Sequence, residues 1–291
     1  MHGRGDAVGS RCGEGVCGVM TDGRLNAVVT QRIEVAPGLF ILQVVPDGWQ
    51  LPPFRPGQFA VLGLPPEAPR HPMADPTDDP PPKPGALIRR SYSIASSSAD
   101  QQYLEFYLNL VRSGSLTPRL CALEVGGRLW LGPRISGLFT FDQLPDGVNL
   151  VMVATGTGLA PYMSMLRTEL EYEKNRRLAV LHSARHSWDL GYRAELIMME
   201  RLRRNLTYVA TVSRPQEEPV PWGGLVGHVQ ELWQRRILEE IWGFRPEPGN
   251  THVFLSGNPD MIEEMAAILA GEGFREHTPQ RPGEVHVEKY W

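Results

Sequence analysis

The chain has 291 residues, of which 42% are hydrophobic, and its 29 basic and 33 acidic side chains give a formal charge of −4. A chain this apolar can bury a core, so global disorder is excluded, and the small negative charge argues against a nucleic-acid-binding protein. Its three cysteines are too few for a disulfide framework or an iron–sulfur cluster with four ligands, and we expect a reducing compartment, the cytoplasm.

Residues 1–24 are rich in glycine, aspartate and arginine, and we expect them to be disordered. Arg4 and Arg11 occur there without the apolar run of a secretory signal, so no such signal is predicted. The chain also lacks a run of about 18 apolar residues, so no membrane span is predicted. Met20 is a second candidate for the start of translation.

Residues 25–145 contain short apolar runs separated by glycine and proline turn signals, which is typical of a small antiparallel β-barrel. A short helix is expected at residues 116–123. The strands are expected at residues 27–35, 39–45, 58–64, 91–95, 104–110 and 128–131. Nine prolines lie within residues 65–84 of this domain. We interpret this segment as a solvated insertion, with a polyproline site for a partner as the alternative.

In residues 146–291 apolar runs alternate with helical patterns, which predicts an α/β domain with a parallel sheet. Strands are expected at residues 150–154, 178–182, 208–212, 252–255 and 285–287. Helices are expected at residues 160–172, 193–204, 228–240 and 259–269. In the second helix, Ala194, Ile197, Met198 and Leu202 are predicted to share one apolar face. The fold class is therefore an all-β antiparallel barrel followed by an α/β parallel-sheet domain.

The first candidate site is the run Arg90, Ser91, Tyr92 and Ser93 in a barrel strand. Alternation along the strand places Arg90 and Tyr92 on one face. A guanidinium suits a diphosphate because its planar fork makes charge-assisted hydrogen bonds, and a phenol ring can stack on a planar heterocycle. An exposed arginine beside a half-buried tyrosine in an ordinary barrel is the alternative.

The second candidate is the turn from Ala154 through Thr155, Gly156, Thr157 and Gly158, which follows an apolar strand and opens a helix. Glycine lets backbone amides approach a ligand, and a helix N-terminus favours a pyrophosphate. The third glycine of the Rossmann motif is absent. A generic turn between strand and helix is therefore the alternative.

Three further candidates lie at predicted strand ends or at the terminus. Arg185 and Arg214 follow two parallel strands, and a cationic pair there suits an extra phosphate such as the 2′-phosphate of NADP, with solvated surface arginines as the alternative. Ser256 is expected to point into the same cleft as Thr155. Tyr290 and Trp291 end the chain, either as part of a docked terminal strand or as a cover for a flavin ring.

Together these motifs resemble the ferredoxin–NADP reductase family, and within it the bacterial ferredoxin/flavodoxin reductases. The resemblance covers about residues 27–291 and includes the run from Gly114 through Ser115, Leu116 and Thr117. It implies that residues 25–145 form an FAD-binding domain and residues 146–291 an NADP-binding domain. The function implied is electron transfer between NADP(H) and ferredoxin or flavodoxin, with hydride exchanged at the flavin N5 atom.

The resemblance also assigns roles to individual residues. Arg90 would hold the FAD pyrophosphate, Tyr92 would stack on the isoalloxazine, and Ser93 would lie near N5. The other FAD contacts implied are Ser91, Gly114, Ser115, Leu116, Thr117, Tyr290 and Trp291. The NADP(H) contacts implied are Thr155, Gly156, Thr157 and Gly158 at the pyrophosphate and Arg185 and Arg214 at the 2′-phosphate. Ser256, Glu288 and a movable Tyr290 would complete the catalytic set with Ser93. No metal site is predicted.

Two departures from the family pattern affect these expectations. Ser256 stands where relatives usually have cysteine, which predicts a less favourable geometry for hydride transfer. His228 stands where relatives often have arginine, which predicts a milder preference for NADP. Arg55, Arg112 and Arg119 are candidates for docking an acidic ferredoxin, with a solvated surface as the alternative.

Two other functions fit parts of the pattern. One is the NAD(P)H reductase component of an oxygenase system, whose iron–sulfur domain would have to lie on another chain. The other is a non-catalytic module that binds a nucleotide to regulate a partner. The electron acceptor, the direction of electron flow and the oligomeric state are left open by the sequence.

Overall fold

The structure, a computed structural model, describes residues 24–76, 85–142, 144–169 and 176–289. Within these residues, the N-terminal half forms a six-stranded antiparallel sheet with strand order β4-β3-β6-β1-β2-β5. The strands are β1 (Ala27–Ala36), β2 (Leu39–Pro46), β3 (Phe59–Leu64), β4 (Ile88–Ser93), β5 (Leu104–Asn109) and β6 (Arg128–Ser136). Residues 1–23 contain most of the segment expected to be disordered, and they lie outside the described residues.

The two edge strands of this sheet approach each other and close it into a barrel. Ile94, directly after β4, forms an antiparallel bridge with Phe106 of β5, and the amide of Ala95 donates to the carbonyl of Glu105 at 2.8 Å. The interior is filled by side chains such as Phe40 and Leu62, which are fully buried. The expected antiparallel barrel is therefore confirmed, with its seam between β4 and β5.

The C-terminal half forms a second sheet, in which the described neighbours are all parallel and have the order β10-β9-β8-β7-β11-β12. The strands are β7 (Asn149–Thr155), β8 (Leu178–Ala184), β9 (Leu206–Val212), β10 (Leu225–Val226), β11 (Thr251–Gly257) and β12 (Val285–Lys289). The strand order turns back at β7, since the chain moves outward to β10 and returns through β11. The carboxyl end of β7 is therefore the switch point where α/β sheets bind ligands.

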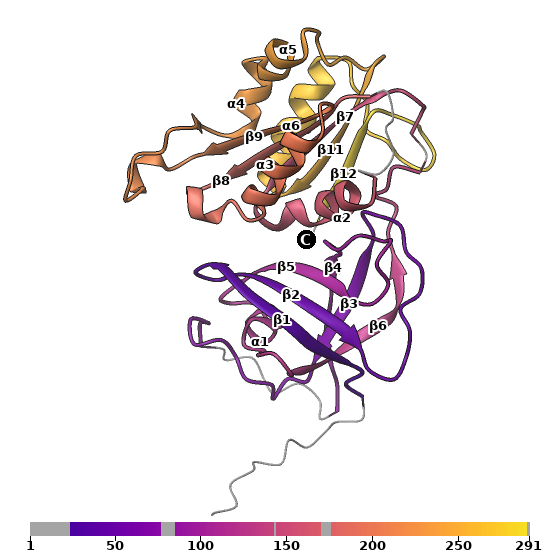
Figure 1. The fold of residues 1–291 in the computed structure, drawn as a ribbon, viewed down its shortest axis with the longest axis vertical. Coiled ribbons are helices and arrows are strands. Elements are labelled where there is room, and N and C mark those ends of the chain that lie inside the picture. The colour runs from indigo at the N-terminus through magenta and orange to yellow at the C-terminus, as the bar shows by residue number, and fades with distance from the viewer. Residues whose placement is uncertain (1–23, 77–84, 143, 170–175, 290–291) are drawn as a thin grey trace, which may run out of the picture.

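Helices cover both faces of the parallel sheet, and Figure 1 shows α2 and α3 on the side nearer the barrel. Those two pack in one core cluster with barrel side chains such as Ile41 and Tyr107, whereas α4 to α6 pack in a separate cluster. The helices are α1 (Thr117–Cys121), α2 (Ala160–Glu169), α3 (Arg193–Leu202), α4 (Val229–Gln234), α5 (Ile237–Trp242) and α6 (Pro259–Gly271), with 3-10 turns η1 (Gly156–Leu159), η2 (Ser187–Asp189) and η3 (Pro215–Glu217). Among the helices of the described residues, none has the length and apolarity that crossing a membrane requires.

Two local predictions are wrong. The helix expected at residues 228–240 is broken into α4 and α5, because Arg236 adopts a left-handed conformation with φ of 57°. The buried residues of α3 are Leu196 and Met199, whereas Met198 and Leu202 are exposed. The predicted domain boundary at residue 145 falls in the connection between β6 and β7, and it stays a prediction.

Candidate functional site

The predicted flavin-binding residues lie on β4, at one edge of the antiparallel sheet. Arg90 is exposed, and its Nη1 donates to the carbonyl of Arg89 at 2.8 Å, while Ser91 is also exposed. Tyr92 is half-buried against the barrel core, and this burial raises the pKa of its phenol well above the ordinary value. The edge strand thus presents a cation and a neutral aromatic ring two residues apart.

The turn at residues 114–117 connects β5 to α1 and has backbone donors to offer. Among the described residues, no backbone acceptor is bonded to the N–H groups of Ser115, Leu116 or Thr117. The hydroxyl of Thr117 accepts from the amide of Val111 at 3.2 Å, which fixes the turn from within. Because buried or half-buried N–H groups normally have partners, three free ones in succession fit an oxyanion such as a phosphate.

Two arginines hold this turn from the opposite side. Arg70, in the proline-rich segment, donates through Nη1 to the carbonyl of Gly114 at 3.1 Å. Arg119 is 8% exposed, and it donates to the carbonyl of Ser115 at 2.5 Å and through Nε to that of Pro66 at 3.0 Å. The carbonyls of Gly114 and Ser115 are thus engaged by guanidinium groups, whereas the N–H groups of residues 115–117 have no backbone acceptor among the described residues.

The described part of the proline-rich segment is hydrogen-bonded to the rest of the barrel domain. The amide of His71 donates to the carbonyl of Pro118 at 2.8 Å, and that of Asp75 to the carbonyl of Arg112 at 3.0 Å. Residues 65–76 therefore lie along α1 and the turn before it, but none of them is buried, so the interpretation as a solvated insertion stays a prediction. Residues 77–84 lie outside the described residues.

The expected docking arginines are engaged within the chain. Arg119 is buried, Arg55 pairs with Asp142, and Arg112 pairs with Asp75 at 3.0 Å. The surface hypothesis is wrong for Arg119, because its guanidinium is used to hold two carbonyl groups. Arg55 and Arg112 keep more than half of their side-chain surface exposed, but each carries a carboxylate beside it.

The glycine turn after β7 packs against the end of β11. A Cβ on Gly158 would lie 2.3 Å from the carbonyl oxygen of Ser256, and one on Gly257 would lie 2.2 Å from Oγ1 of Thr155. By contrast, Gly156 has φ of +54° and nothing within 4 Å of a Cβ position, so its surface is open, and Thr157 beside it is half-buried. The turn has one tightly packed side and one open side, which fits a nucleotide phosphate lying across its backbone.

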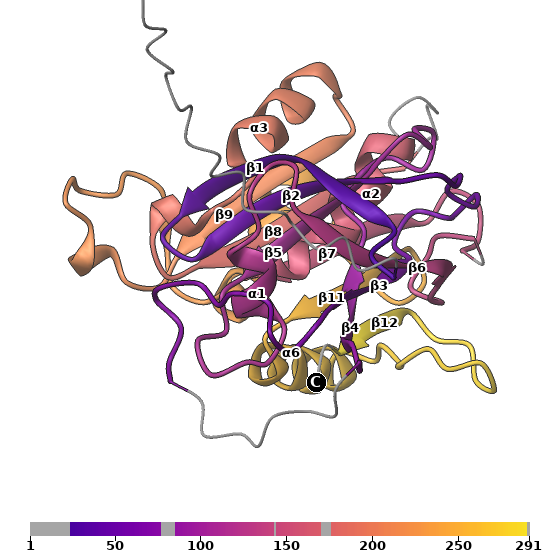
Figure 2. The same ribbon diagram turned by 90° about the horizontal axis from the view of Figure 1, so that it is seen from below.

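Three of the four predicted catalytic residues, Ser93, Ser256 and Glu288, lie where the barrel touches the parallel sheet. Ser256 is fully buried and stands opposite Ala154 in β7 and Glu288 in β12. Oγ of Ser93, at the end of β4, donates to Oε2 of Glu288 at 3.1 Å, across 195 positions of sequence. Figure 2 shows β4 beside β12. The two sheets therefore contact each other through residues that the sequence singled out.

The predicted 2′-phosphate residues also lie together. The amide of Arg214 donates to the carbonyl of Arg185 at 2.9 Å, and both side chains are exposed. Glu217 lies beside them, 3.4 Å from Nη1 of Arg214 and 2.8 Å from Nε2 of His186. This hydrogen bond to Glu217 is the main cause that raises the pKa of His186, and it lowers the pKa of Glu217 in return.

His228 lies at the start of α4, and it is exposed. Its amide donates to Oε1 of Glu231 at 3.1 Å. A carboxylate thus stands next to His228 at the start of α4. Tyr290 and Trp291 lie outside the described residues, so their predicted positions near the flavin are not described.

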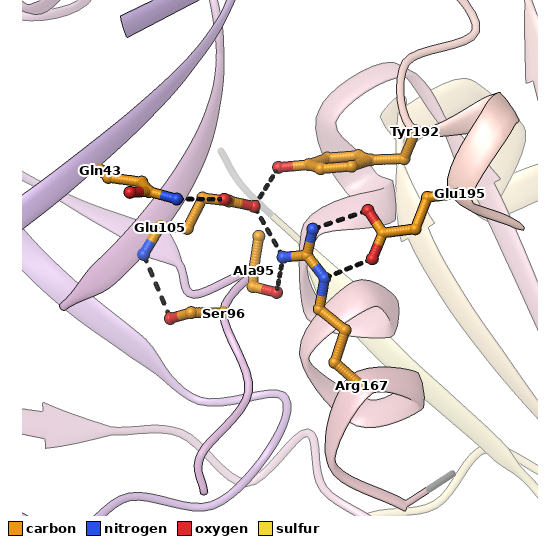
Figure 3. Close-up of polar contacts among 7 residues, drawn as sticks. All are labelled: Gln43, Ala95, Ser96, Glu105, Arg167, Tyr192 and Glu195. Atoms are coloured by element: carbon orange, nitrogen blue, oxygen red, sulfur yellow. Dashed lines mark hydrogen bonds and ion pairs between the residues drawn. The ribbon is translucent and has the colours of Figure 1, made fainter. Parts of the chain in front are cut away.

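Sequence reasoning missed a charged network between the two halves, drawn in Figure 3. Arg167 of α2 pairs with Glu105 of β5 at 2.6 Å and with Glu195 of α3 at 2.7 Å. One signal was available, because Glu105 is an acid between Leu104 and Phe106 in an apolar strand. Such a residue is buried only when it has a partner.

Known proteins resemble this chain in both sequence and structure. The oxidoreductase NAD-binding domain family matches residues 152–267. The flavodoxin/ferredoxin–NADP reductase of Escherichia coli (strain K12) is 31% identical over 240 residues, which cover 82% of this chain and 88% of that protein. The chain belongs to the flavodoxin/ferredoxin–NADP reductase family.

Other members of the flavodoxin/ferredoxin–NADP reductase family agree with this assignment. Ferredoxin–NADP reductase A of Sorangium cellulosum is 32% identical over 213 residues, 70% of this chain and 74% of that protein. A crystal structure of a ferredoxin NADP+ reductase from Neisseria gonorrhoeae with bound FAD and NADP has a TM-score of 0.76 at 21% identity and covers 92% of this chain and 99% of that chain. The predictions of the family, of an oxidoreductase and of its two-part fold are confirmed.

Proposed function

We propose that this chain is an FAD-dependent reductase that transfers electrons between NADP(H) and a one-electron carrier, ferredoxin or flavodoxin. The observation that carries the proposal is the 3.1 Å contact of Ser93, on the strand of Arg90 and Tyr92, with Glu288, on the strand beside Ser256. Bound FAD converts between a two-electron donor and one-electron acceptors, which protein side chains cannot do. The residues of the chain bind and orient the two cofactors.

On the barrel side, Arg90 binds the FAD pyrophosphate with Ser91 beside it, and Tyr92 provides the stacking surface. The free amides of Ser115, Leu116 and Thr117, with Gly114 before them, receive phosphate oxygens. The turn needs little reorganisation when the phosphates bind, because Arg70 and Arg119 already hold its carbonyl groups in place.

On the parallel-sheet side, Thr155, Gly156, Thr157 and Gly158 bind the NADP pyrophosphate at the switch point of the sheet. Arg185 and Arg214 receive the 2′-phosphate, with Glu217 reducing their net charge. This cluster supports a preference for NADP(H) over NAD(H) that is milder than two unopposed arginines would give.

Between the two cofactor sites, Glu288 orients the hydroxyl of Ser93, and Ser256 supplies a buried hydroxyl at the end of β11. We assign to Tyr290 the second face of the flavin ring, from which it moves aside during turnover, and to Trp291 a contact at the adenine end. In this proposal the enzyme works in the cytoplasm, the reducing compartment that its few cysteines indicate.

The test is an anaerobic titration of the purified protein. A yellow preparation that releases FAD on denaturation and is bleached by one equivalent of NADPH supports the proposal, and added oxidised ferredoxin or flavodoxin should restore the colour. Arg90→Gln should lose FAD, whereas Arg134→Gln, at an exposed position of β6, should keep it. Bleaching by NADH alone would favour an oxygenase reductase component. A colourless protein that binds NADP+ would favour a regulatory module.

A further inference from the structure

The guanidinium of Arg167 bonds to both halves of the molecule at once. Nη1 donates to the carbonyl of Ala95 at 2.8 Å and to Oε1 of Glu105 at 2.6 Å, both in the barrel. Nε and Nη2 donate to the two oxygens of Glu195 in α3 at 2.7 and 2.8 Å. Figure 3 shows the guanidinium between these groups. Its side chain is 18% exposed, so these bonds are shielded from water.

Glu105 on the barrel side is fixed as firmly as the arginine. Its side chain is 7% exposed, and Oε1 also accepts from the hydroxyl of Tyr192 at 2.7 Å. Oε2 accepts from Nε2 of Gln43 at 3.3 Å, and its amide donates to Oγ of Ser96 at 3.1 Å. A carboxylate with this many partners has one available orientation.

The network adjoins, along the chain, the segments of both proposed cofactor sites. Ala95 comes two residues after Ser93, and Glu105 stands at the barrel seam, where its carbonyl receives the amide of Ala95. Arg167 belongs to α2, the helix that follows the glycine turn η1. The next residue, Thr168, accepts from the amide of Ser98 at 2.9 Å through Oγ1. The loop after the flavin-binding strand β4 is thus bonded to α2, the helix that follows the proposed NADP-binding turn.

We propose that Arg167 is a positioning residue, which sets the distance between the flavin-binding strand and the NADP-binding turn and so the rate of electron transfer between the two cofactors. The proposal rests on the proposed function. It follows from the geometric demand of the reaction, since the reacting atoms must lie about 3–3.5 Å apart and a misplacement of about 1 Å can cost a hundredfold in rate. Arginine suits this task because its planar fork fixes several bonds at set angles, which a lysine ammonium does not.

The network is better explained by geometry than by stability. A buried ion pair adds little net free energy to the stability of a fold, because desolvation of the two charges offsets their attraction. The hydrogen bonds of the pair nevertheless fix the relative orientation of the two side chains. The apolar contacts of α2 and α3 with Ile41 and Tyr107 already hold the halves together. Among the described residues, the hydrogen bonds of Arg167 go to Ala95, Glu105 and Glu195, none of which is assigned to bind a cofactor, so its loss should leave both binding sites intact.

The experiment compares Arg167→Met and Arg167→Lys with Arg201→Met, at an exposed position on α3. FAD content, the Kd for NADP+, and the rate of flavin bleaching at saturating NADPH are measured anaerobically by stopped flow. In both Arg167 variants we expect FAD content and the Kd for NADP+ to stay within threefold of wild type. The saturating rate should fall at least tenfold with little change in KM. Amide hydrogen exchange at Ser98 should rise, and Arg201→Met should match wild type in every measurement.

The proposal is overturned if Arg167→Met binds FAD and bleaches at the wild-type rate. If that variant loses FAD or does not fold, Glu195→Gln is the deciding variant. It keeps the shape of the Glu195 side chain and weakens its two hydrogen bonds with the guanidinium of Arg167, without changing a barrel residue. A tenfold lower saturating rate with bound FAD then supports the proposal, while an unchanged rate or a second loss of FAD overturns it. Wild-type protein that NADPH does not bleach would refute the proposed function, and the exchange at Ser98 would still test the linkage.

Discussion

The two predicted phosphate sites use arginine in opposite ways. At residues 114–117, Arg70 and Arg119 turn inward and donate to carbonyl groups, so the chain itself occupies them. At the ends of β8 and β9, Arg185 and Arg214 are exposed, and Glu217 lies 3.4 Å from Nη1 of Arg214. One site is rigid and presents amides, whereas the other is open and presents charges.

This difference matches the demands of a resident cofactor and of an exchanging substrate. A site organised before binding loses little entropy when its ligand arrives, which favours slow release. Each contact of an exposed charge contributes less binding free energy, because water and salt screen it. Exposed charges still speed the association of an anion and permit its fast dissociation. Substitutions at the two sites test this contrast, beginning with the largest expected effect.

Arg119→Met should damage the rigid site most. Removing the guanidinium leaves the carbonyls of Pro66 and Ser115 without these hydrogen-bond donors. We expect this loss to destabilise the FAD-binding turn by about 3 kcal/mol. We expect the Kd for FAD to rise about a hundredfold, measured by the fluorescence of released flavin. Arg134→Met, on the exposed side of β6, is the control. Unchanged FAD affinity in Arg119→Met would show that the turn is not held by its guanidinium.

Gly158→Ala should damage the glycine turn through a steric clash. The added Cβ would lie 2.3 Å from the carbonyl oxygen of Ser256, and relief of such overpacking costs about 2–3 kcal/mol. We expect kcat/KM for NADPH to fall by about fiftyfold. Gly156→Ala is the matched variant, because its Cβ meets open space and only the left-handed backbone is penalised, by about 1 kcal/mol. Equal losses in the two variants would contradict the packing argument.

Arg214→Ala should change the open site selectively. Losing a charge-assisted bond to the 2′-phosphate should lower the preference for NADPH over NADH by about 2 kcal/mol, close to thirtyfold. The ratio of the two kcat/KM values measures this preference. Glu217→Gln should move the same ratio the other way, because it removes the carboxylate beside Arg214. If neither variant moves the ratio, the 2′-phosphate binds elsewhere.

The smallest expected effect is a pH dependence from His186. Its pKa is raised mainly by the hydrogen bond to Glu217, with Asp189 also contributing, so it stays charged to a higher pH than usual. Below that pKa the imidazolium adds to Arg185 and Arg214, and above it this attraction is lost. We therefore expect KM for NADPH to rise about threefold as the pH increases through the pKa of His186.

The control for this titration is His186→Asn, in which the 2′-phosphate still titrates but the imidazole does not. The pH profile of KM for NADPH should flatten in this variant, and the profile for NADH should be the same in both proteins. A pH profile for NADPH that is unchanged by the substitution would remove His186 from the site.

The positions of the strands along the chain and of the glycine turn could be predicted because they depend on local patterns. Alternation, glycine and proline mark where strands end, so β1 to β6 and the turn after β7 lie near their expected residues. The break at Arg236 could not be predicted, since no glycine or proline marks it and apolar residues continue on both sides. The spacing of apolar residues along the chain cannot reveal a left-handed backbone conformation that is stabilised by tertiary packing.

The pairings of charged groups were also beyond the sequence. Arg167 and Glu105 are 62 positions apart, and nothing in either neighbourhood specifies the other. Arg119 was expected on the surface, to dock an acidic ferredoxin or as a solvated side chain, yet Pro66 supplies a carbonyl that its guanidinium binds. The candidate sites consist of residues that are contiguous in sequence, so the sequence could suggest them, whereas the long-range contacts that support them could not be predicted.

The proline-rich segment sets a limit for anyone who wishes to shorten this chain. Its first twelve residues, 65–76, bond to Pro118 and Arg112 through the amides of His71 and Asp75. Prolines restrict the unfolded chain, so fixing this segment against α1 costs less entropy than fixing an ordinary loop of equal length. A minimal version of the enzyme should therefore keep residues 65–76 and replace only residues 77–84. Flavin retention during dilution would show at once whether the cut was made too early.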